Sequence, residues 1–301
     1  MHVNTQSGHT VASPLALFDL DGTLISLDEG VSAQVSQALH HASSAGWRLA
    51  VCTGRALCLV PASVREVGEM HHYVCSNGAC VTDGDGRPLM RHAMESAQVM
   101  AAMDDLAELE PGYNMFTGPE AYFEWRNFTY MFAAQGARMS GGLSRGLRVL
   151  SRFVGPQAKN AGRSQVKSVR PHVEEAHDGV EKFGCSFSDA ESCLEAQRRL
   201  AWLGGFEVIE VRPTELEVTA EGVTKATGTR WLMDHLGVDA RDTVAFGDGM
   251  NDASLVGTVG RFVAMGNAIQ EVKDEADDVC GPVDDDGVAA WIERELAGRD
   301  A

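Results

Sequence analysis

Short apolar segments alternate with helical stretches at both ends of the chain. The apolar segments lie at residues 15–18, 48–52, 73–75, 243–246 and 262–265, and each ends in a loop rich in polar residues or glycine. This pattern is typical of buried strands. Helical stretches cover about residues 29–45, 224–236 and 288–296. Strands that alternate with helices predict right-handed βαβ units and a doubly wound parallel sheet.

The middle of the chain has a different pattern. Residues 87–212 combine two helical stretches, at about 96–109 and 189–203, with extended runs at 128–132 and 206–211. Segments 140–146 and 155–164 are polar or glycine-rich and predict loops. We therefore predict an α/β core domain at residues 14–86 and 213–301, an inserted α+β domain at 87–212, and a disordered tail at 1–13.

Composition and charge exclude several classes of partner. The 301 residues are 44% hydrophobic and 23% charged, as in an ordinary globular protein, and suffice for two domains. Lys and Arg number 25 against 43 Asp and Glu, which gives a formal net charge of −18. Because this charge repels a phosphate backbone or an anionic bilayer, we expect no nucleic-acid and no membrane partner.

The cysteines and the N-terminus predict a cytoplasmic protein. The seven cysteines include no CxxC pair, so neither a structural zinc site nor a disulfide framework is favoured. Residues 1–13 lack the basic and apolar regions of a secretory signal, and no apolar run reaches the roughly 18 residues of a membrane helix.

Polar side chains follow the predicted strands where these end. In a doubly wound sheet the carboxyl ends of the strands form the ligand crevice, so we expect five residues from distant parts of the chain to meet there. They are Asp19, Asp21, Thr53, Asn77 and Asp248. Three carboxylates without thiolates favour a hard cation such as Mg²⁺.

Four motifs in order resemble those of the haloacid dehalogenase-like hydrolases. They are FDLDGTL at 18–24, TGR at 53–55, Lys225 in GVTK at 222–225, and GDGMND at 247–252. SNGA at 76–79, GNA at 266–268 and DGVA at 286–289 are similar to the Cof-type branch, which carries a large cap between its second and third motifs. The resemblance implies a Rossmann-like core with an inserted C2-type cap that selects the substrate.

The resemblance also implies a Mg²⁺-dependent phosphatase. Asp19 is then the nucleophile that forms an aspartyl phosphate, and Asp21 is the acid and base. Asp19, Asp248 and the backbone carbonyl of Asp21 hold the metal. The residues that bind phosphate or substrate are then Thr53, Gly54, Arg55, Asn77, Lys225 and Asn251. Asp252 does not contact the substrate but orients Lys225. The expected partner is a small phosphomonoester, such as a sugar phosphate or a phosphorylated cofactor, and the expected assembly is a monomer or small homo-oligomer.

Other interpretations of the same residues stay open. A phosphomutase uses the same aspartyl phosphate but returns the phosphoryl group to the substrate. A catalytically idle binding protein keeps the fold, although every expected catalytic position is filled here. True dehalogenases usually lack the second aspartate that Asp21 supplies. In the predicted cap, Tyr113, Tyr122 and Trp125 either stack on substrate or pack in the cap core.

Overall fold

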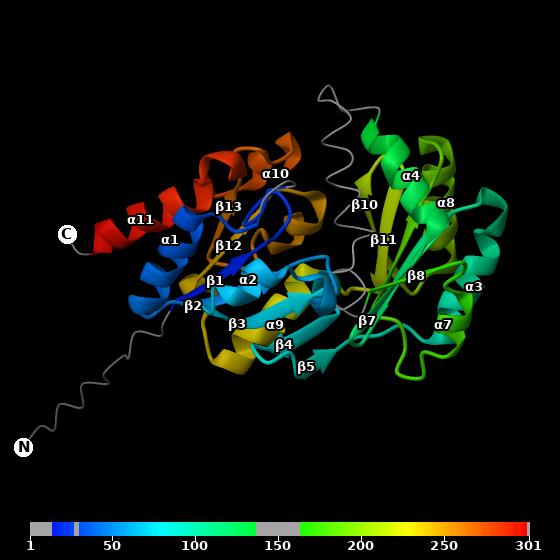
Figure 1. Ribbon diagram of the computed structural model, residues 1–301, viewed down its shortest axis with the longest axis horizontal. Coiled ribbons are helices and arrows are strands. Elements are labelled where there is room, and N and C mark those ends of the chain that lie inside the picture. Colours follow the sequence, from blue (N-terminus) through cyan, green and yellow to red (C-terminus); the bar gives the residue numbers. More distant parts are fainter. Residues whose placement is uncertain (1–13, 27–29, 137–162, 300–301) are drawn as a thin grey trace, which may run out of the picture.

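The computed structural model describes residues 14–26, 30–136 and 163–299. The tail expected at 1–13 and the loop expected at 140–146 lie outside these residues, as does the loop expected at 155–164 up to residue 162. The described chain forms two sheets, one in each of two neighbouring bodies (Figure 1). No helix among these residues combines the length and the apolar character that a membrane span needs.

An eight-stranded sheet forms the core domain, in the order β14-β13-β12-β1-β2-β3-β4-β5. Six neighbouring strands, from β14 to β3, are parallel, whereas β4 and β5 add an antiparallel edge. The strands are β1 (Leu15–Phe18), β2 (Arg48–Cys52), β3 (Met70–Cys75), β4 (Cys80–Asp83), β5 (Pro88–Arg91), β12 (Thr243–Gly247), β13 (Arg261–Ala264) and β14 (Asp278–Val279). This topology confirms the doubly wound, Rossmann-like core.

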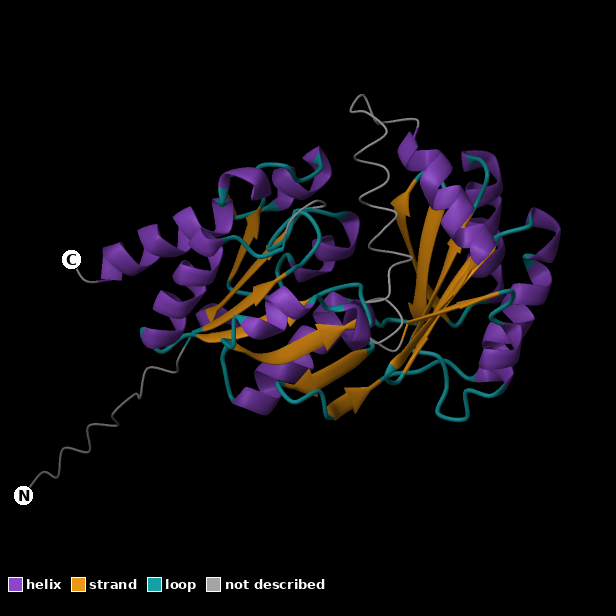
Figure 2. Ribbon diagram, in the orientation of Figure 1, coloured by secondary structure: helices purple, strands orange, loops and turns teal. Residues whose placement is uncertain are grey.

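Helices cover both faces of this sheet (Figure 2). Phe246 of β12 packs edge-on against Trp291 of the C-terminal helix on one face. On the opposite face the thiol of Cys52 lies 3.7 Å from the hydroxyl of Thr229. The helices are α1 (Ala33–Ser44), α2 (Ala62–Glu66), α9 (Lys225–Leu236), α10 (Gln270–Glu275) and α11 (Gly287–Arg299). Because both faces of the sheet are covered, side chains on both faces are apolar, and the sequences of these strands are continuous hydrophobic runs.

The second sheet forms the cap, in the order β10-β11-β9-β6-β7-β8. Its strands are β6 (Gly112–Thr117), β7 (Glu120–Glu124), β8 (Arg163–Val166), β9 (Lys182–Ser186), β10 (Phe206–Arg212) and β11 (Glu215–Ala220). Its helices are α3 (Ser96–Asp105), α4 (Trp125–Gly136), α7 (Arg170–Glu174) and α8 (Ala190–Leu203). Leu216 and Val218 of β11 point into the apolar layer under α3, α7 and α8. Because side chains alternate along a strand, Glu215 and Glu217 point to the other face.

One element differs from the sequence prediction. Residues 128–132 were expected to be extended, because FTYMF is rich in aromatic residues, but they lie inside helix α4. Tertiary contacts stabilise the helix at this position. The side-chain amide of Asn127 is fully buried and donates to the carbonyl of Gly112 and the hydroxyl of Ser186. Gly112 permits the approach, since a Cβ there would lie 2.1 Å from the backbone nitrogen of Asn127.

The chain also passes between the two sheets at different points from those expected. Strand β5 belongs to the core sheet although it follows residue 87, and β11 belongs to the cap sheet although it follows residue 212. Both strands pair with hairpin partners, β4 and β10, and these pairings place the boundaries elsewhere than the change of sequence pattern predicted. The connections between the sheets therefore fall at residues 92–95 and 221–224 rather than at 87 and 213.

Candidate active site

The motif residues follow the carboxyl ends of neighbouring core strands. Asp19 follows β1, Thr53 follows β2 and Asp248 follows β12, and these three strands are adjacent in the sheet. Backbone hydrogen bonds tie the loops together: the amide of Asp19 donates to Phe246, and that of Asn77 donates to Thr53. The predicted convergence of these loops at one edge is thus a direct result of strand order.

A buried lysine joins two of the predicted carboxylates. The ammonium nitrogen of Lys225 lies 2.6 Å from Oδ1 of Asp19 and 2.6 Å from Oδ1 of Asp252. Lys225 and Asp252 are fully buried and Asp19 is nearly so. Burial disfavours the charged lysine, but these two carboxylates hold the pKa of Lys225 well above its ordinary value. Lys225 occupies the first residue of α9, whose N-terminus is fixed by a capping box from Thr224.

Asp252 also organises the loop that carries Asp248. Its Oδ2 accepts hydrogen bonds of 3.0 Å from the backbone amides of Asp248 and Gly249. A Cβ at Gly247 would lie 2.3 Å from the carboxyl carbon of Asp252, so only glycine allows this approach. Asp252 therefore contacts both Lys225 and the loop that carries Asp248.

Three carboxylates form a cluster suited to a divalent cation. One oxygen each of Asp19, Asp248 and Asp252 lie within 4.8 Å of one another. Without a cation, burial is the main cause that raises the pKa of Asp19, and burial together with Asp252 raises that of Asp248 to about 7. The cluster carries more negative charge than Lys225 alone neutralises, and its oxygen donors are those that Mg²⁺ prefers.

Asp248 is held from a further loop. The side-chain amide of Asn267 lies 2.8 Å from the carbonyl of Gly22 and 3.4 Å from Oδ2 of Asp248. Its own oxygen accepts a hydrogen bond from the amide of Val283, which fixes the orientation of the amide group. Asn267 belongs to the GNA segment of the family resemblance, but sequence reasoning assigned it no role.

The Asp21 side chain lies apart from the three clustered carboxylates. The guanidinium of Arg55 donates to both of its oxygens, at 2.5 and 2.7 Å, and also donates to the carbonyl of Leu59. Burial raises the pKa of Asp21, but the charge and hydrogen bonds of Arg55, together with the charges of Lys225 and Arg212, outweigh burial and lower that pKa overall. Arg55 thus contacts the predicted acid and base in this structure.

Asn77 and Asn251 meet beside Gly54. The Nδ2 atom of Asn251 lies 3.3 Å from Oδ1 of Asn77, and a Cβ at Gly54 would lie 2.8 Å from that same oxygen. Asn77 has a positive φ of 53°, a conformation that asparagine tolerates better than most residues. Thr53 is buried and its hydroxyl accepts from the amide of Arg55 at 3.2 Å.

The cap contributes two residues that the sequence did not single out. Oε2 of Glu217 accepts a hydrogen bond of 2.7 Å from Nδ2 of Asn77, and Oε1 forms an ion pair with Lys182. The alternation of Glu215, Leu216, Glu217 and Val218 was the available signal for an acidic strand face. Nothing local indicated that this face meets the core.

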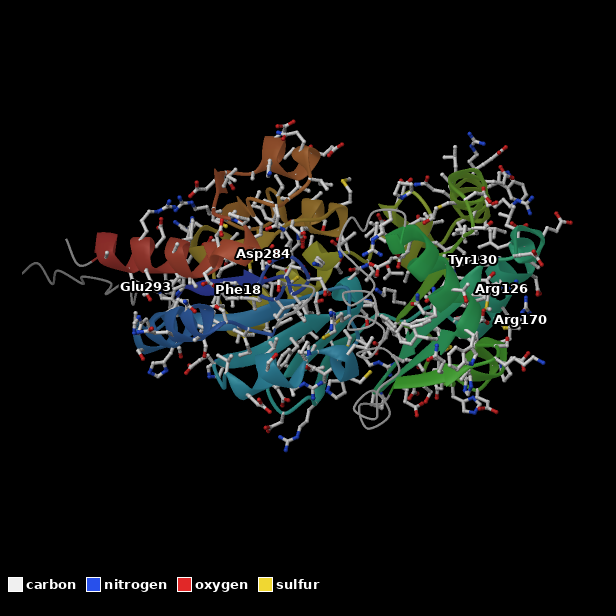
Figure 3. All side chains as sticks on the ribbon, turned by 45° about the horizontal axis from the view of Figure 1, so that its top comes forward. Phe18, Arg126, Tyr130, Arg170, Asp284 and Glu293 are labelled. Atoms are coloured by element: carbon white, nitrogen blue, oxygen red, sulfur yellow. The ribbon has the colours of Figure 1, made fainter. Side chains whose placement is uncertain are left out.

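The cap aromatics that were candidates for substrate stacking have other contacts. Tyr113 is buried in the cap core, and Tyr122 stacks on His172 with ring centroids 4.0 Å apart. Trp125 is half exposed at the start of α4. Figure 3 shows Arg126, Tyr130 and Arg170 in the cap, away from Phe18 in the core.

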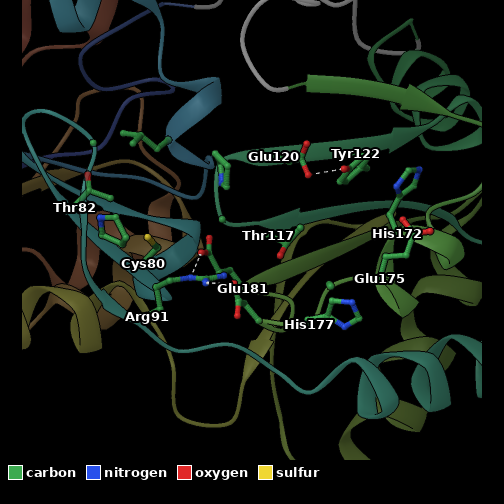
Figure 4. Close-up of a pocket in the computed structure, with 17 residues that line it drawn as sticks. Cys80, Thr82, Arg91, Thr117, Glu120, Tyr122, His172, Glu175, His177 and Glu181 are labelled. Atoms are coloured by element: carbon green, nitrogen blue, oxygen red, sulfur yellow. Dashed lines mark hydrogen bonds and ion pairs between the residues drawn. The ribbon is translucent and has the colours of Figure 1, made fainter.

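A separate cavity of about 570 Å³ lies where the β4–β5 hairpin meets β6, β7 and α7 (Figure 4). None of the predicted catalytic, phosphate-binding or metal-binding residues lines it, although Tyr122, a candidate for substrate stacking, does. Glu181 is nearly inaccessible there and joins the domains: it accepts from Arg91 at 2.8 Å and from Ser76 at 3.2 Å. Burial raises the pKa of Glu181, and Arg91 opposes that shift.

Comparisons with known proteins agree with the motifs. A model of the haloacid dehalogenase-like hydrolase family matches residues 16–292. The chain belongs to this family. The membership expected from the four motifs is therefore confirmed, and with it the expectation that the protein is an enzyme of the hydrolase class.

Individual relatives match over nearly their whole length. Phosphatase YwpJ of Bacillus subtilis (strain 168) is 29% identical over 287 residues, which cover 94% of this chain and 99% of YwpJ. The 5-amino-6-(5-phospho-D-ribitylamino)uracil phosphatase YwtE of the same organism is 27% identical over 291 residues, covering 93% of this chain and 97% of YwtE. A solved haloacid dehalogenase-like hydrolase from B. subtilis has a TM-score of 0.81 at 24% identity, covering 93% of this chain and 99% of that one. This solved structure shares the fold over nearly the whole chain.

Proposed function

We propose that the protein is a Mg²⁺-dependent phosphatase that hydrolyses a small phosphomonoester, such as a sugar phosphate or a phosphorylated cofactor, in the cytoplasm. The observation that carries this proposal is the buried bridge from Lys225 to Asp19 and Asp252, with Asp248 in the same carboxylate cluster. Named relatives support the reaction class, since YwpJ and YwtE are both phosphatases and the YwtE substrate is a phosphomonoester.

In the first step a carboxylate oxygen of Asp19 attacks phosphorus, and the bond from phosphorus to the leaving oxygen breaks. Asp21 gives its proton to the departing alkoxide, so the products are an alcohol and an aspartyl phosphate on Asp19. Lys225 and the Thr53 hydroxyl bind the phosphoryl oxygens, and Asn251 and Asn77 position the group. For this step Asp21 must be protonated and separate from Arg55.

In the second step water attacks the phosphorus of the aspartyl phosphate while Asp21 takes its proton. The bond between phosphorus and the Asp19 oxygen breaks, which releases inorganic phosphate and restores the carboxylate. Asp19, Asp248 and the backbone carbonyl of Asp21 would hold Mg²⁺, which would supply positive charge that offsets the repulsion between carboxylate and phosphate. Asp252 keeps Lys225 charged and in place.

Phosphate release from a panel of phosphomonoesters tests this proposal. We expect release with Mg²⁺, none with excess chelator, and none from the Asp19→Asn variant. Acid quenching followed by mass spectrometry should find a phosphoryl group on the peptide that contains Asp19. Phosphoryl transfer to another position of the substrate without release would identify a mutase, and a folded protein that forms no phosphoryl-enzyme would refute the proposal.

A further inference from the structure

We propose that the Glu217–Lys182 pair of the cap selects the leaving group of the substrate, with Glu217 accepting a hydrogen bond from a hydroxyl of a neutral, polyhydroxylated leaving group. This inference rests on the proposed phosphatase function and adds to it the residues that choose the substrate. Its basis is the position, the remaining hydrogen-bonding capacity and the charge of the cap residues at the site.

Position is the first observation. Glu217 lies on the face of the cap sheet opposite the helices, and its carboxylate contacts Asn77 of the core at 2.7 Å. A Cβ at Gly54 would lie 3.2 Å from Oε2 of Glu217, beside the loop that follows Thr53. Glu217 therefore reaches from the cap to the predicted phosphate-binding loops, where a leaving group attached to the phosphate must lie.

The local sheet structure fixes the pair in this place. Glu217 is directly opposite Gly184 in the neighbouring strand, so no side chain crowds it from that position. Lys182 is almost fully buried, and its ammonium nitrogen sits 4.7 Å from the centre of the Phe116 ring. An ion pair held in this way keeps a defined orientation, which a residue that selects among substrates requires.

Hydrogen-bonding capacity is the second observation. Among the residues that the structure describes, each oxygen of Glu217 has one donor, Asn77 on one and Lys182 on the other. A carboxylate has about four lone-pair positions, so Glu217 can accept further hydrogen bonds. A hydroxyl-bearing leaving group supplies such donors, whereas an aryl group without substituents that donate does not.

Charge is the third observation. A second ion pair, Arg212 with Glu215, lies in the same hairpin, and Glu215 is two residues from Glu217 on β11. The two pairs together are neutral and present both donors and acceptors. This array suits hydroxyl groups, which both donate and accept, and it offers no excess positive charge for a leaving group with a second anion.

Three substrates and two variants test the proposal. The substrates are p-nitrophenyl phosphate, which has no hydroxyl donor, ribitol 5-phosphate, and 3-phosphoglycerate, which carries a carboxylate. The Glu217→Gln variant keeps the size of the side chain and an acceptor oxygen but removes the charge. Glu210→Gln makes the same change at an exposed position of the same hairpin, on β10.

For Glu217→Gln we expect kcat/KM for ribitol 5-phosphate to fall about 10-fold or more, because a hydroxyl binds a neutral amide less strongly than a carboxylate. The value for p-nitrophenyl phosphate should stay within about 3-fold, and that for 3-phosphoglycerate should rise relative to both. Glu210→Gln should leave all three ratios unchanged. An equal fall for the aryl and polyol substrates, or no fall, overturns the proposal, since a residue that only holds the cap would act on both alike.

A binding measurement separates this inference from the proposed function. In the Asp19→Asn background, calorimetry should find that Glu217→Gln weakens binding of ribitol 5-phosphate about 10-fold. Unchanged binding refutes the role of the pair even if the enzyme is a phosphatase. Weakened binding supports the pair even if no substrate is hydrolysed, a result that would refute the phosphatase instead.

Discussion

The ammonium group of Lys225 lies 2.6 Å from a carboxylate oxygen of Asp19, although 205 residues separate them in the chain. It lies equally close to Asp252, so one cation satisfies two carboxylates in a buried site. Removing one partner of such a group leaves charges that neither water nor another residue compensates. Stability and activity should therefore both depend on this lysine.

The Lys225→Met variant tests that dependence. We expect the free energy of unfolding to fall by about 3–5 kcal/mol, because Asp19 and Asp252 lose their shared partner. We expect kcat to fall by about 10²-fold or more, because a cation that binds the transferring oxygens is lost. Urea unfolding and steady-state kinetics measure the two effects. The exposed Lys167→Met variant serves as control and should match the wild type.

The Asp21→Asn variant tests the acid and base role. An alkyl phosphate needs a proton on its leaving oxygen, so its hydrolysis should fall about 10²- to 10⁴-fold. p-Nitrophenolate leaves without a proton, so the variant should release a burst of about one equivalent and then turn over slowly. Rapid-mixing absorbance measures the burst. Equal losses on both substrates, without a burst, would contradict the assignment of Asp21 as the acid.

Gly78→Ala tests the close packing that positions α9. Gly78 has a φ of 89°, and a Cβ there would lie 2.0 Å from the carbonyl oxygen of Thr224, the residue before Lys225. Gly46 has a similar φ of 87° but nothing within 4 Å of its Cβ position. We expect Gly78→Ala to destabilise the protein by about 1–3 kcal/mol more than Gly46→Ala, the difference being the cost of overpacking. Equal unfolding midpoints for the two variants would contradict this prediction, because α9 could then shift away from the added methyl group without loss of stability.

His72 predicts a pH dependence of stability away from the site. Burial lowers its pKa from 6.5, and His235, His71 and Arg48 add to the shift while Asp83 opposes it. Between the folded and unfolded pKa values the unfolded chain binds more protons, so stability falls as the pH drops through this range. From about pH 7.5 to about pH 5.5, His72→Gln should lose less stability than the wild type. The exposed His92→Gln variant should follow the wild type, and parallel curves for His72→Gln would contradict the prediction.

The parts of the site that follow from local pattern could be predicted from sequence. Strand β1 is a buried apolar run that ends just before Asp19, and β12 is one that ends just before Asp248. Sheet geometry then brings their ends together whatever the chain between them does. Lys225 was identifiable because GVTK at 222–225 resembles the third family motif and stands at the start of a predicted helix.

The remaining parts depend on contacts between distant segments, which leave no local pattern. The aromatic run 128–132 favours a strand by propensity, yet buried hydrogen bonds of Asn127 place it in a helix. Glu217 resembles any acidic residue on a half-exposed strand until the cap sheet brings it against Asn77. The observed domain boundaries differ from the predicted ones for the same reason, because the pairing partners of a strand decide which sheet it joins.

The two connections at residues 92–95 and 221–224 make the cap a single insertion in an otherwise continuous core sheet. A chimaera that exchanges the cap with that of a relative at these points preserves every strand pairing of both sheets. The exchange must match the contacts that join the domains. Among the described residues these include Glu181 with Ser76 and Arg91, Glu217 with Asn77, and the apolar cluster of Phe116 and Phe123 with Ala56. Under the proposed role of the cap, grafting would therefore change substrate preference, while the residues proposed to carry out the chemistry stay where they are.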